Sequence, residues 1–280
     1  MRKLWHRFVE RQLIKHFAKK NVKIEILGSG AKSLAFITDT GNVIRIKPIW
    51  LGTYKKEHRI LAIIAQNSDI ATKVPKIRSL ISFPFSLSIH RAIEGQTLEQ
   101  LSLSPHYNIA DFSTTFATDL AEFLSNLFVI GHQPGMKKKF RPKTYSIFND
   151  AVYYLQLRKY VKKKELLRTY LELRHASKNA PIGLIHNDLH GTNIIVNDKL
   201  ELLGIIDFGL IHQRGFEYNL RKLPPELCEL IIEHAEALKV IKIDRAVLKY
   251  YHVRNALFRI KKTKSKTDKA EWIKLLKNML

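Results

Sequence analysis

The sequence predicts an α+β fold with two lobes, a small β-rich N-terminal lobe and a larger helical C-terminal lobe. Strand-like alternation fills the first third of the chain, and helical periodicity dominates from residue 97 onward. With 280 residues, 45% of them hydrophobic, the chain is globular and long enough for one or two domains. We therefore expect three parts, at residues 1–20, 21–93 and 94–280.

Residues 1–20 are expected to form a basic amphipathic helix. Apolar residues recur at helical spacing, with arginine and lysine between them. The apolar positions are Leu4, Trp5, Phe8, Val9, Leu13 and Phe17. Such a helix can rest on an anionic membrane, but packing against its own domain is the favoured interpretation.

The N-terminal lobe is expected to contain five strands and a helix. Alternating apolar residues predict strands at 22–27, 34–38 and 43–47, a helix follows at 54–66, and a further hairpin reaches Ile93.

Gly28, Ser29 and Gly30 lie between the first two strands. Glycine lets backbone amides approach phosphates closely, so these residues are candidates for a hairpin that covers a nucleotide. An ordinary hairpin turn fits them equally well. The segment is not a Walker A loop, because a strand rather than a helix follows it.

Arg45 and Lys47 occupy one face of the third strand, since side chains alternate along a strand. Glu57 on the following helix is the natural partner of either cation. Such a pair can hold the phosphates of a nucleotide. The spacing does not choose between the two cations, and a surface cation beside a surface glutamate remains the alternative.

The C-terminal lobe reads as mostly helical, interrupted by two short strands. The helical segments are 111–130, 146–175 and 225–280, and the strands are 194–196 and 203–206.

Two motifs around these short strands carry the clearest chemistry. They are His186-Asn187-Asp188-Leu189-His190-Gly191-Thr192-Asn193 and Ile206-Asp207-Phe208-Gly209. Their spacing suits phosphoryl transfer from Mg-ATP to a hydroxyl group. Asp188 would orient the hydroxyl and accept its proton, Asn193 and Asp207 would bind Mg²⁺, and His186 would brace the loop.

An alternative uses His186, Asp188 and His190 as the metal ligands of a hydrolase. That interpretation leaves Asn193 and Asp207 unexplained, so phosphoryl transfer is favoured.

Charge and cysteine content limit the other classes. The chain has 48 Lys and Arg against 25 Asp and Glu, which gives a net charge of +23. Such a charge attracts phosphates, nucleic acid or anionic membranes. The alternative interpretation is a basic surface that is simply solvated. One cysteine excludes an internal disulfide framework. No apolar run reaches the roughly 20 residues of a membrane span, and the N-terminus lacks a signal-peptide core. We expect a cytoplasmic protein, with a peripheral place at the inner membrane face left open.

At these motifs the sequence resembles the aminoglycoside phosphotransferase and choline kinase superfamily, a branch of the protein-kinase-like fold. The family pattern is His-Gly-Asp-Leu-His-Pro-Gly-Asn followed by Ile-Asp-Phe, and the matching residues are His186, Asp188, Leu189, His190, Asn193, Ile206, Asp207 and Phe208. The resemblance implies that Glu57 is the glutamate of the family's αC helix. It also implies that the backbone from His90 to Ala92 contacts adenine.

The sequence departs from the family in places. Asn187 and Gly191-Thr192 replace the usual glycine and Pro-Gly, and Asn219 stands where the family often has aspartate. Aminoglycosides are polycations, so the charge of +23 makes antibiotics poor candidate acceptors.

We therefore expect a kinase that uses ATP and Mg²⁺ to phosphorylate a small-molecule or anionic lipid-linked sugar acceptor. The alternatives are an atypical kinase of the RIO type, which would contact RNA through basic patches, and a non-catalytic nucleotide-binding scaffold.

Overall fold

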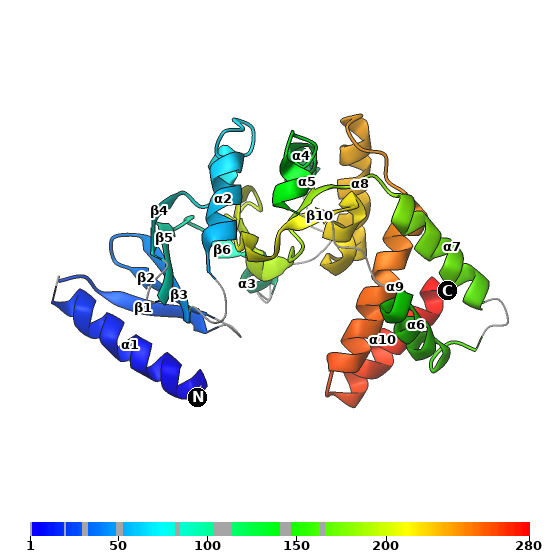
Figure 1. The fold of residues 1–280 in the computed structure, drawn as a ribbon, viewed down its shortest axis with the longest axis horizontal. Coiled ribbons are helices and arrows are strands. Elements are labelled where there is room, and N and C mark those ends of the chain that lie inside the picture. Colours follow the sequence, from blue (N-terminus) through cyan, green and yellow to red (C-terminus); the bar gives the residue numbers. More distant parts are fainter. Residues whose placement is uncertain are drawn as a thin grey trace. The chain divides into compact units, whose positions relative to one another are not determined.

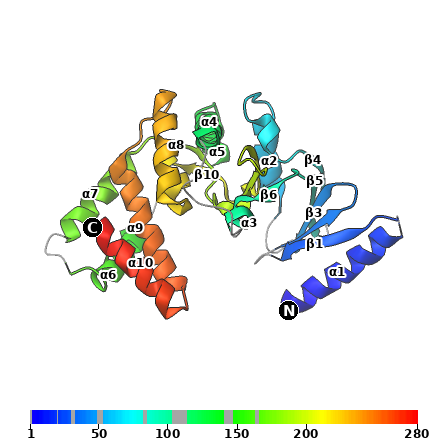
Figure 2. The ribbon, with the colours of Figure 1, turned by 180° about the vertical axis from the view of Figure 1, so that it is seen from behind.

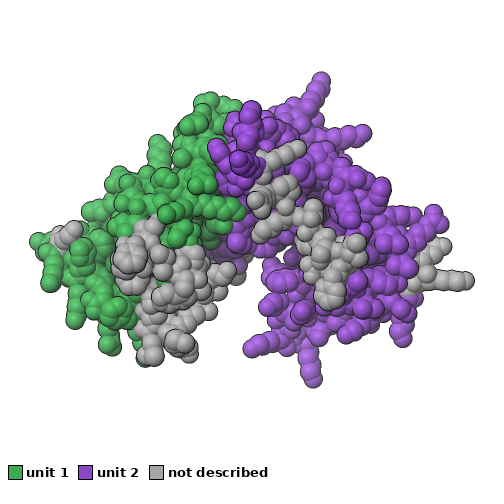
Figure 3. Space-filling model, viewed as in Figure 1, with its two compact units in different colours: residues 1–96, 195–198, 203–209 green, residues 97–194, 199–202, 210–280 purple. Residues whose placement is uncertain are grey.

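A computed structural model describes residues 2–19, 21–29, 33–48, 53–81, 85–102, 114–140, 147–162 and 166–280. These residues form two compact units, shown in separate colours in Figure 3. Unit 1 comprises residues 1–96, 195–198 and 203–209, and unit 2 comprises residues 97–194, 199–202 and 210–280. The mixed α+β class expected from the sequence is confirmed, with the main sheet near the N-terminus and most helices after it.

Unit 1 is built on a five-stranded antiparallel sheet with strand order β1-β2-β3-β5-β4. The strands are β1 (Ile24–Ser29), β2 (Leu34–Thr38), β3 (Asn42–Pro48), β4 (Ile77–Ile81) and β5 (Phe85–Arg91). Buried and partly exposed residues alternate along β2 and β3, as a half-buried sheet requires.

The N-terminal helix α1 (Arg2–Ala18) runs along this sheet (Figures 1 and 2). Val9 of α1 is 3% exposed and packs in one cluster with Phe36 and Ile44 of the sheet. Leu13 and Phe17 pack against the same cluster, whereas Phe8 remains 55% exposed. The apolar stripe of α1 thus covers its own domain, the interpretation favoured from the sequence.

The helix α2 (Lys55–Ile64) turns Glu57 and three apolar residues inward.

A second, three-stranded sheet follows, with order β6-β8-β9 and strands β6 (Gln96–Thr97), β8 (Ile194–Val196) and β9 (Leu202–Ile205). Gly95 precedes it with φ +140°, and a Cβ there would lie 2.7 Å from the carbonyl oxygen of Val196. Only glycine fits this approach.

Unit 2 is mostly helical. Its elements are α3 (Leu98–Ser102), α4 (Thr114–Ile130), α5 (Met136–Lys139), α6 (Ile147–Arg158), α7 (Leu166–Asn179), β7 (Gly183–Ile185), β10 (His212–Arg214), the 3₁₀ segment η6 (Phe216–Lys222), α8 (Pro225–Ala237), α9 (Arg245–Lys262) and α10 (Lys266–Met279). The apolar α4 is buried along most of its length, and β7 pairs with β10. A separate core joins α6, α7, α9 and α10.

The structure differs from the sequence expectation at several places, and β7 and β10 are strands that the sequence did not predict. Residues 195–198 and 203–209 cluster with unit 1 rather than with the rest of the C-terminal segment, because β8 and β9 pair with β6. The single helix expected near 146–175 is instead α6, which ends at Arg158, and α7, which begins at Leu166. Like-charge repulsion between Arg158 and Lys162, four residues apart, disfavours a continuous helix there.

No helix among the described residues is long and apolar enough to cross a membrane.

Candidate functional site

In unit 1, Arg45 of β3 contacts two carboxylates. Its Nη1 donates a very short hydrogen bond to Oε1 of Glu57 on α2, and its Nη2 lies 2.8 Å from Oδ1 of Asp207. Glu57 is 5% exposed, whereas the side chain of Asp207 is 43% exposed. Burial opposes the positive charge of Arg45, but the two carboxylates more than offset it and raise the pKa of the guanidinium.

Burial also raises the pKa of the Glu57 carboxyl, and the charge of Arg45 opposes that effect. Lys47, the second candidate cation, has its Nζ 4.1 Å from the centroid of the Tyr54 ring. The two cations left open by the sequence therefore have different surroundings, and Arg45 is the one hydrogen-bonded to Glu57 and Asp207.

The proposed nucleotide-covering hairpin lies only partly in the described residues. Gly28 and Ser29 end β1, pair with Ala35 and Leu34 of β2, and follow an irregularity in register after Ile26. Gly30 lies outside the described residues.

His90 and Ala92 lie at and just after the end of β5. The N–H of Arg91 donates to the carbonyl of Lys76 at 3.2 Å, and the N–H of Ala92 donates to that of Gly41 at 2.9 Å. The amides of Arg91 and Ala92 are therefore already used in hydrogen bonds within unit 1. The His90 ring is buried, which lowers its pKa to about 4, so it is neutral near pH 7.

In unit 2, the segment from His186 to Asn193 follows directly after β7 and is fixed by hydrogen bonds. The His186 N–H donates to Oδ1 of Asn219 at 3.0 Å, and the Asp188 N–H donates to Nδ1 of His186 at 3.3 Å. The Nδ2 of Asn193 donates to the carbonyl of Asp188 at 2.9 Å. His186 and Asn219 are fully buried, so both brace the loop from inside.

Two non-glycine residues of the motifs have left-handed backbones, Asn187 with φ 67° and Asp207 with φ 64°. Such conformations cost free energy and persist where the surroundings enforce them, often at functional sites. Around Asn187 the enforcing contacts are visible: its Nδ2 donates to the carbonyl of Leu210 at 3.1 Å, and Arg221 donates to its carbonyl at 2.6 Å.

Asp188 lies in a cationic environment. Lys222 of η6 donates a very short hydrogen bond to Oδ1 of Asp188, and Nε2 of His190 lies 3.6 Å from the same oxygen. Partial burial by itself would raise the pKa of Asp188, but the contact with His190, the hydrogen bond from Lys222 and the charge of Lys222 lower it well below its usual range. Asp188 is therefore ionised at neutral pH.

The sequence predicts Asn193 and Asp207 as Mg²⁺ ligands. Both carry hard oxygen donors of the kind that Mg²⁺ prefers, and the hydrogen bond of Asn193 is made by its nitrogen rather than its oxygen. Within the described part of the chain, no group of three or more His, Cys, Asp and Glu side chains could hold a metal ion. The hydrolase alternative, with His186, Asp188 and His190 as ligands, thus gains no support.

Sequence reasoning missed Arg221 and Lys222. Arg221 donates to the carbonyls of Asn187 and Tyr218, both at 2.6 Å, and Lys222 contacts Asp188. Asn187 and Asp188, the partners in the loop, each lie 34 positions before the cation that contacts them. The signal for them in the sequence is their position just after Asn219, which corresponds to an aspartate of the family pattern.

A cavity of about 230 Å³ in unit 2 contains Asp188. Its lining also includes the cations Arg221, Lys222 and Arg254 and the aromatic residues Tyr153, Tyr218, Tyr251 and Phe258.

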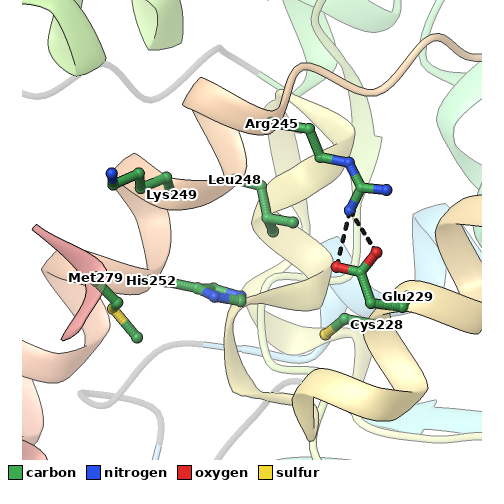
Figure 4. Close-up of a pocket in the computed structure, with 7 residues that line it drawn as sticks. All are labelled: Cys228, Glu229, Arg245, Leu248, Lys249, His252 and Met279. Atoms are coloured by element: carbon green, nitrogen blue, oxygen red, sulfur yellow. Dashed lines mark hydrogen bonds and ion pairs between the residues drawn. The ribbon is translucent and has the colours of Figure 1, made fainter. Parts of the chain in front are cut away.

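A second cavity of unit 2, about 370 Å³, lies between α8, α9 and the end of α10 (Figure 4). Arg245 contacts both carboxylate oxygens of Glu229 there, at 2.8 and 2.7 Å. The thiol of Cys228 is buried and donates to the carbonyl of Leu220, and burial raises its pKa to about 12. This thiol is therefore protonated and not a nucleophile.

The sequence matches the model of the Phosphotransferase enzyme family over residues 23–213. It matches no curated protein.

The fold is similar to several solved structures. One is the GDP complex of wild-type aminoglycoside 2'-phosphotransferase-IIIa, with 16% identity, 97% of each chain covered and a TM-score of 0.68. Another is the streptomycin–ATP–APH(2")-IIa ternary complex, with 15% identity, 95% of each chain covered and a TM-score of 0.62. A third is macrolide 2'-phosphotransferase MphH from Brachybacterium faecium, with 14% identity, coverage of 96% of this chain and 97% of that one, and a TM-score of 0.63. At these identities the similarity shows the fold.

Proposed function

Because this chain belongs to the phosphotransferase enzyme family, and is an ATP-dependent phosphotransferase, we propose that it phosphorylates a hydroxyl group of a small-molecule acceptor. The observation that carries the proposal is the environment of Asp188, a carboxylate kept ionised by Lys222 and His190 at the edge of a cavity. Similar structures hold ATP, ADP or GDP, which supports a nucleotide as the phosphoryl donor.

Asp188 would orient the acceptor hydroxyl and take its proton. As the new bond from acceptor oxygen to γ-phosphorus forms, the bond from γ-phosphorus to the bridging oxygen breaks, and ADP leaves. A carboxylate with a lowered pKa is a weak proton acceptor in the ground state. Its main contribution is therefore orientation, with the proton moving late, after bond formation has made the hydroxyl acidic.

The hydrogen bonds around the loop support a positioning role for His186 and Asn219. His186 accepts from the N–H of Asp188, and Asn219 accepts from the N–H of His186. Neither side chain is accessible to solvent, so they act on the reaction through the backbone of the loop.

Arg45, positioned by Glu57, would bind phosphate oxygens of the nucleotide. A guanidinium carries five N–H donors in a rigid planar arrangement that matches phosphate oxygens. In Arg45 one donor of Nη1 contacts Glu57 and one donor of Nη2 contacts the carboxylate of Asp207. Asn193 and Asp207 would hold Mg²⁺. When bound, that ion would neutralise the charge that develops on the transferred phosphoryl group.

The proposed class of acceptor is broader than the molecules that appear in the names of the similar structures. Those names mention aminoglycosides and a macrolide, for the proteins that carry them. No comparison supports a lipid-linked acceptor, an RNA contact or a peripheral membrane position for this chain. The scaffold alternative is disfavoured because Asp188, Asn193 and Asp207 are all present.

The test is transfer of label from γ-labelled ATP, with Mg²⁺, into the small molecules of a cell extract. Asp188→Asn is expected to bind ATP normally and to lower turnover by about 10²–10⁴-fold, as loss of a positioned base does. Asp69→Asn, the same change at an exposed carboxylate, serves as the control. Turnover by Asp188→Asn within a few fold of wild type would remove Asp188 from the mechanism.

A further inference from the structure

We propose that the acceptor is itself anionic, a hydroxylated molecule that carries a phosphate or carboxylate group and binds in the 230 Å³ cavity beside Asp188. This inference rests on the proposed function, because it identifies the cavity as the acceptor site. It predicts a substrate of opposite charge to an aminoglycoside.

The charge of the cavity lining is the first argument. Three cations, Arg221, Lys222 and Arg254, line it together with a single described carboxylate, Asp188. Lys222 is bonded directly to that carboxylate and offsets its charge. A polycationic acceptor would be repelled by the remaining guanidinium groups, whereas an anion would be attracted, and partial burial strengthens either effect.

Arg254 of α9 provides the second argument, because it is a buried cation held in place. It is 4% exposed, donates to the hydroxyls of Tyr250 at 2.8 Å and Tyr170 at 3.4 Å, and lies 3.8 Å from the centroid of the Tyr153 ring. The two hydroxyls and the Tyr153 ring hold the guanidinium in one orientation. A preorganised guanidinium at a cavity wall is well suited to bidentate recognition of phosphate or carboxylate.

The remaining lining gives the shape of the ligand. The guanidinium groups of Arg221 and Arg214 lie 3.7 and 4.4 Å from the centroid of the Tyr218 ring. The Tyr251 ring packs edge-on against the same ring, with 4.8 Å between the two ring centroids. These rings form rigid walls that suit a flat or cyclic molecule. The volume is below the roughly 300–1,000 Å³ of sites for drug-sized ligands, so a small metabolite or the terminal group of a larger one fits.

The cations could instead serve the phosphates of ATP, and the experiment separates the two cases. The variants are Arg254→Gln, which removes the charge, and Arg254→Lys, which keeps the charge but loses the fork. The matched control is Arg259→Gln, the same change on α9 at an exposed residue that does not line the cavity.

The first measurement is binding of inorganic phosphate, the anion alone, to the wild-type protein and the variants by phosphorus NMR titration in the presence of saturating ADP. We expect saturable binding that weakens about tenfold or more in Arg254→Gln, less in Arg254→Lys, and not in Arg259→Gln. The Kd for ATP should be the same in all four proteins. Absence of phosphate binding to wild type, or a loss of ATP affinity in Arg254→Gln, would overturn the inference.

The second measurement is label transfer from γ-labelled ATP into extract fractions separated beforehand on an anion-exchange resin. Asp188-dependent label is expected in compounds of the retained fraction. A separate lipid fraction distinguishes an anionic lipid headgroup from a free phosphorylated or carboxylated metabolite. Label confined to the unretained fraction would contradict an anionic acceptor while leaving the phosphotransferase proposal intact. Label in no fraction would count against the proposed function, and phosphate binding would still decide whether the cavity accepts an anion.

Discussion

The Oδ1 atom of Asp188 is approached by both Lys222 and His190, and these contacts determine how the carboxyl group titrates. They lower its pKa, so its negative charge persists to low pH in the folded protein. Because the folded-state pKa lies below that of the unfolded chain, ionisation stabilises the fold at pH values above the unfolded-state pKa. This contribution is lost as the pH falls through the folded-state pKa.

Replacing Lys222 by methionine should raise the pKa of Asp188, since the donor and its charge are both removed. The acid limb of the kcat/KM profile is then expected to move to higher pH, while His190 retains part of the effect. The pH–rate profile measures this directly, with Lys242→Met as a control at an exposed lysine. An acid limb that stays in place would mean that a group other than Asp188 is titrating.

The difference between Arg45 and Lys47 is also decided at the level of single contacts. Arg45 contacts Glu57 and Asp207, whereas Lys47 lies over the ring of Tyr54. We expect Arg45→Met to lower kcat/KM for ATP by about 10²-fold or more, as loss of a preorganised charge commonly does. Lys47→Met should have a clearly smaller effect, measured by ATP titration of steady-state rates.

Arg45→Met leaves the buried Glu57 without its cation and can reduce stability, because an unpaired buried charge is costly. Arg45→Lys keeps a positive charge and is the second variant, with folding checked by circular dichroism. A larger loss in Lys47→Met than in either Arg45 variant would assign the phosphate contact to Lys47.

At the scale of elements, the segment η6 (Phe216–Lys222) supplies most of the support for the loop after β7. Asn219 accepts from the backbone of His186, Arg221 holds the carbonyl of Asn187, and Lys222 contacts Asp188. Asparagine at position 219 serves here through its side-chain oxygen, so replacement of the family's usual aspartate retains an acceptor for this hydrogen bond.

Helix α1 is expected to contribute to the stability of unit 1 through one face only. Val9→Ala should lower the free energy of unfolding by about 1–3 kcal/mol, because Val9 is buried against the sheet. Phe8→Ala, at the neighbouring exposed position, should change it by no more than about 0.5 kcal/mol. Urea denaturation of both variants tests this. Equal effects would show that α1 does not pack as described.

At the scale of the whole molecule, the net charge of +23 creates a field that acts on every charged ligand. If the acceptor is anionic, association is accelerated at low salt, and kcat/KM for that acceptor should fall steadily as ionic strength rises from about 0.02 to 0.3 M. Steady-state rates at fixed, saturating ATP measure the slope. A rate that rises with salt would indicate a cationic acceptor.

The sequence by itself determined the fold class, the family and the residues of the two motifs. Strand alternation and helical periodicity are local properties, and Asp188, Asn193 and Asp207 lie within 20 consecutive residues, in two short motifs. The sequence also places the candidate cations Arg45 and Lys47 on one face of a strand, because strand side chains alternate. Choosing between them requires the contacts that each side chain makes in the folded protein.

Only the tertiary structure decided what surrounds these residues. Lys222, Arg221 and Arg254 come from η6 and α9, far along the chain from Asp188, and no local pattern reports a contact that chain folding creates. Their proximity fixes the pKa of Asp188 and the charge of the cavity, because both depend on distances between groups that sequence spacing does not contain. The residues of the loop could therefore be predicted from the sequence, whereas the charge of the cavity beside Asp188 could not.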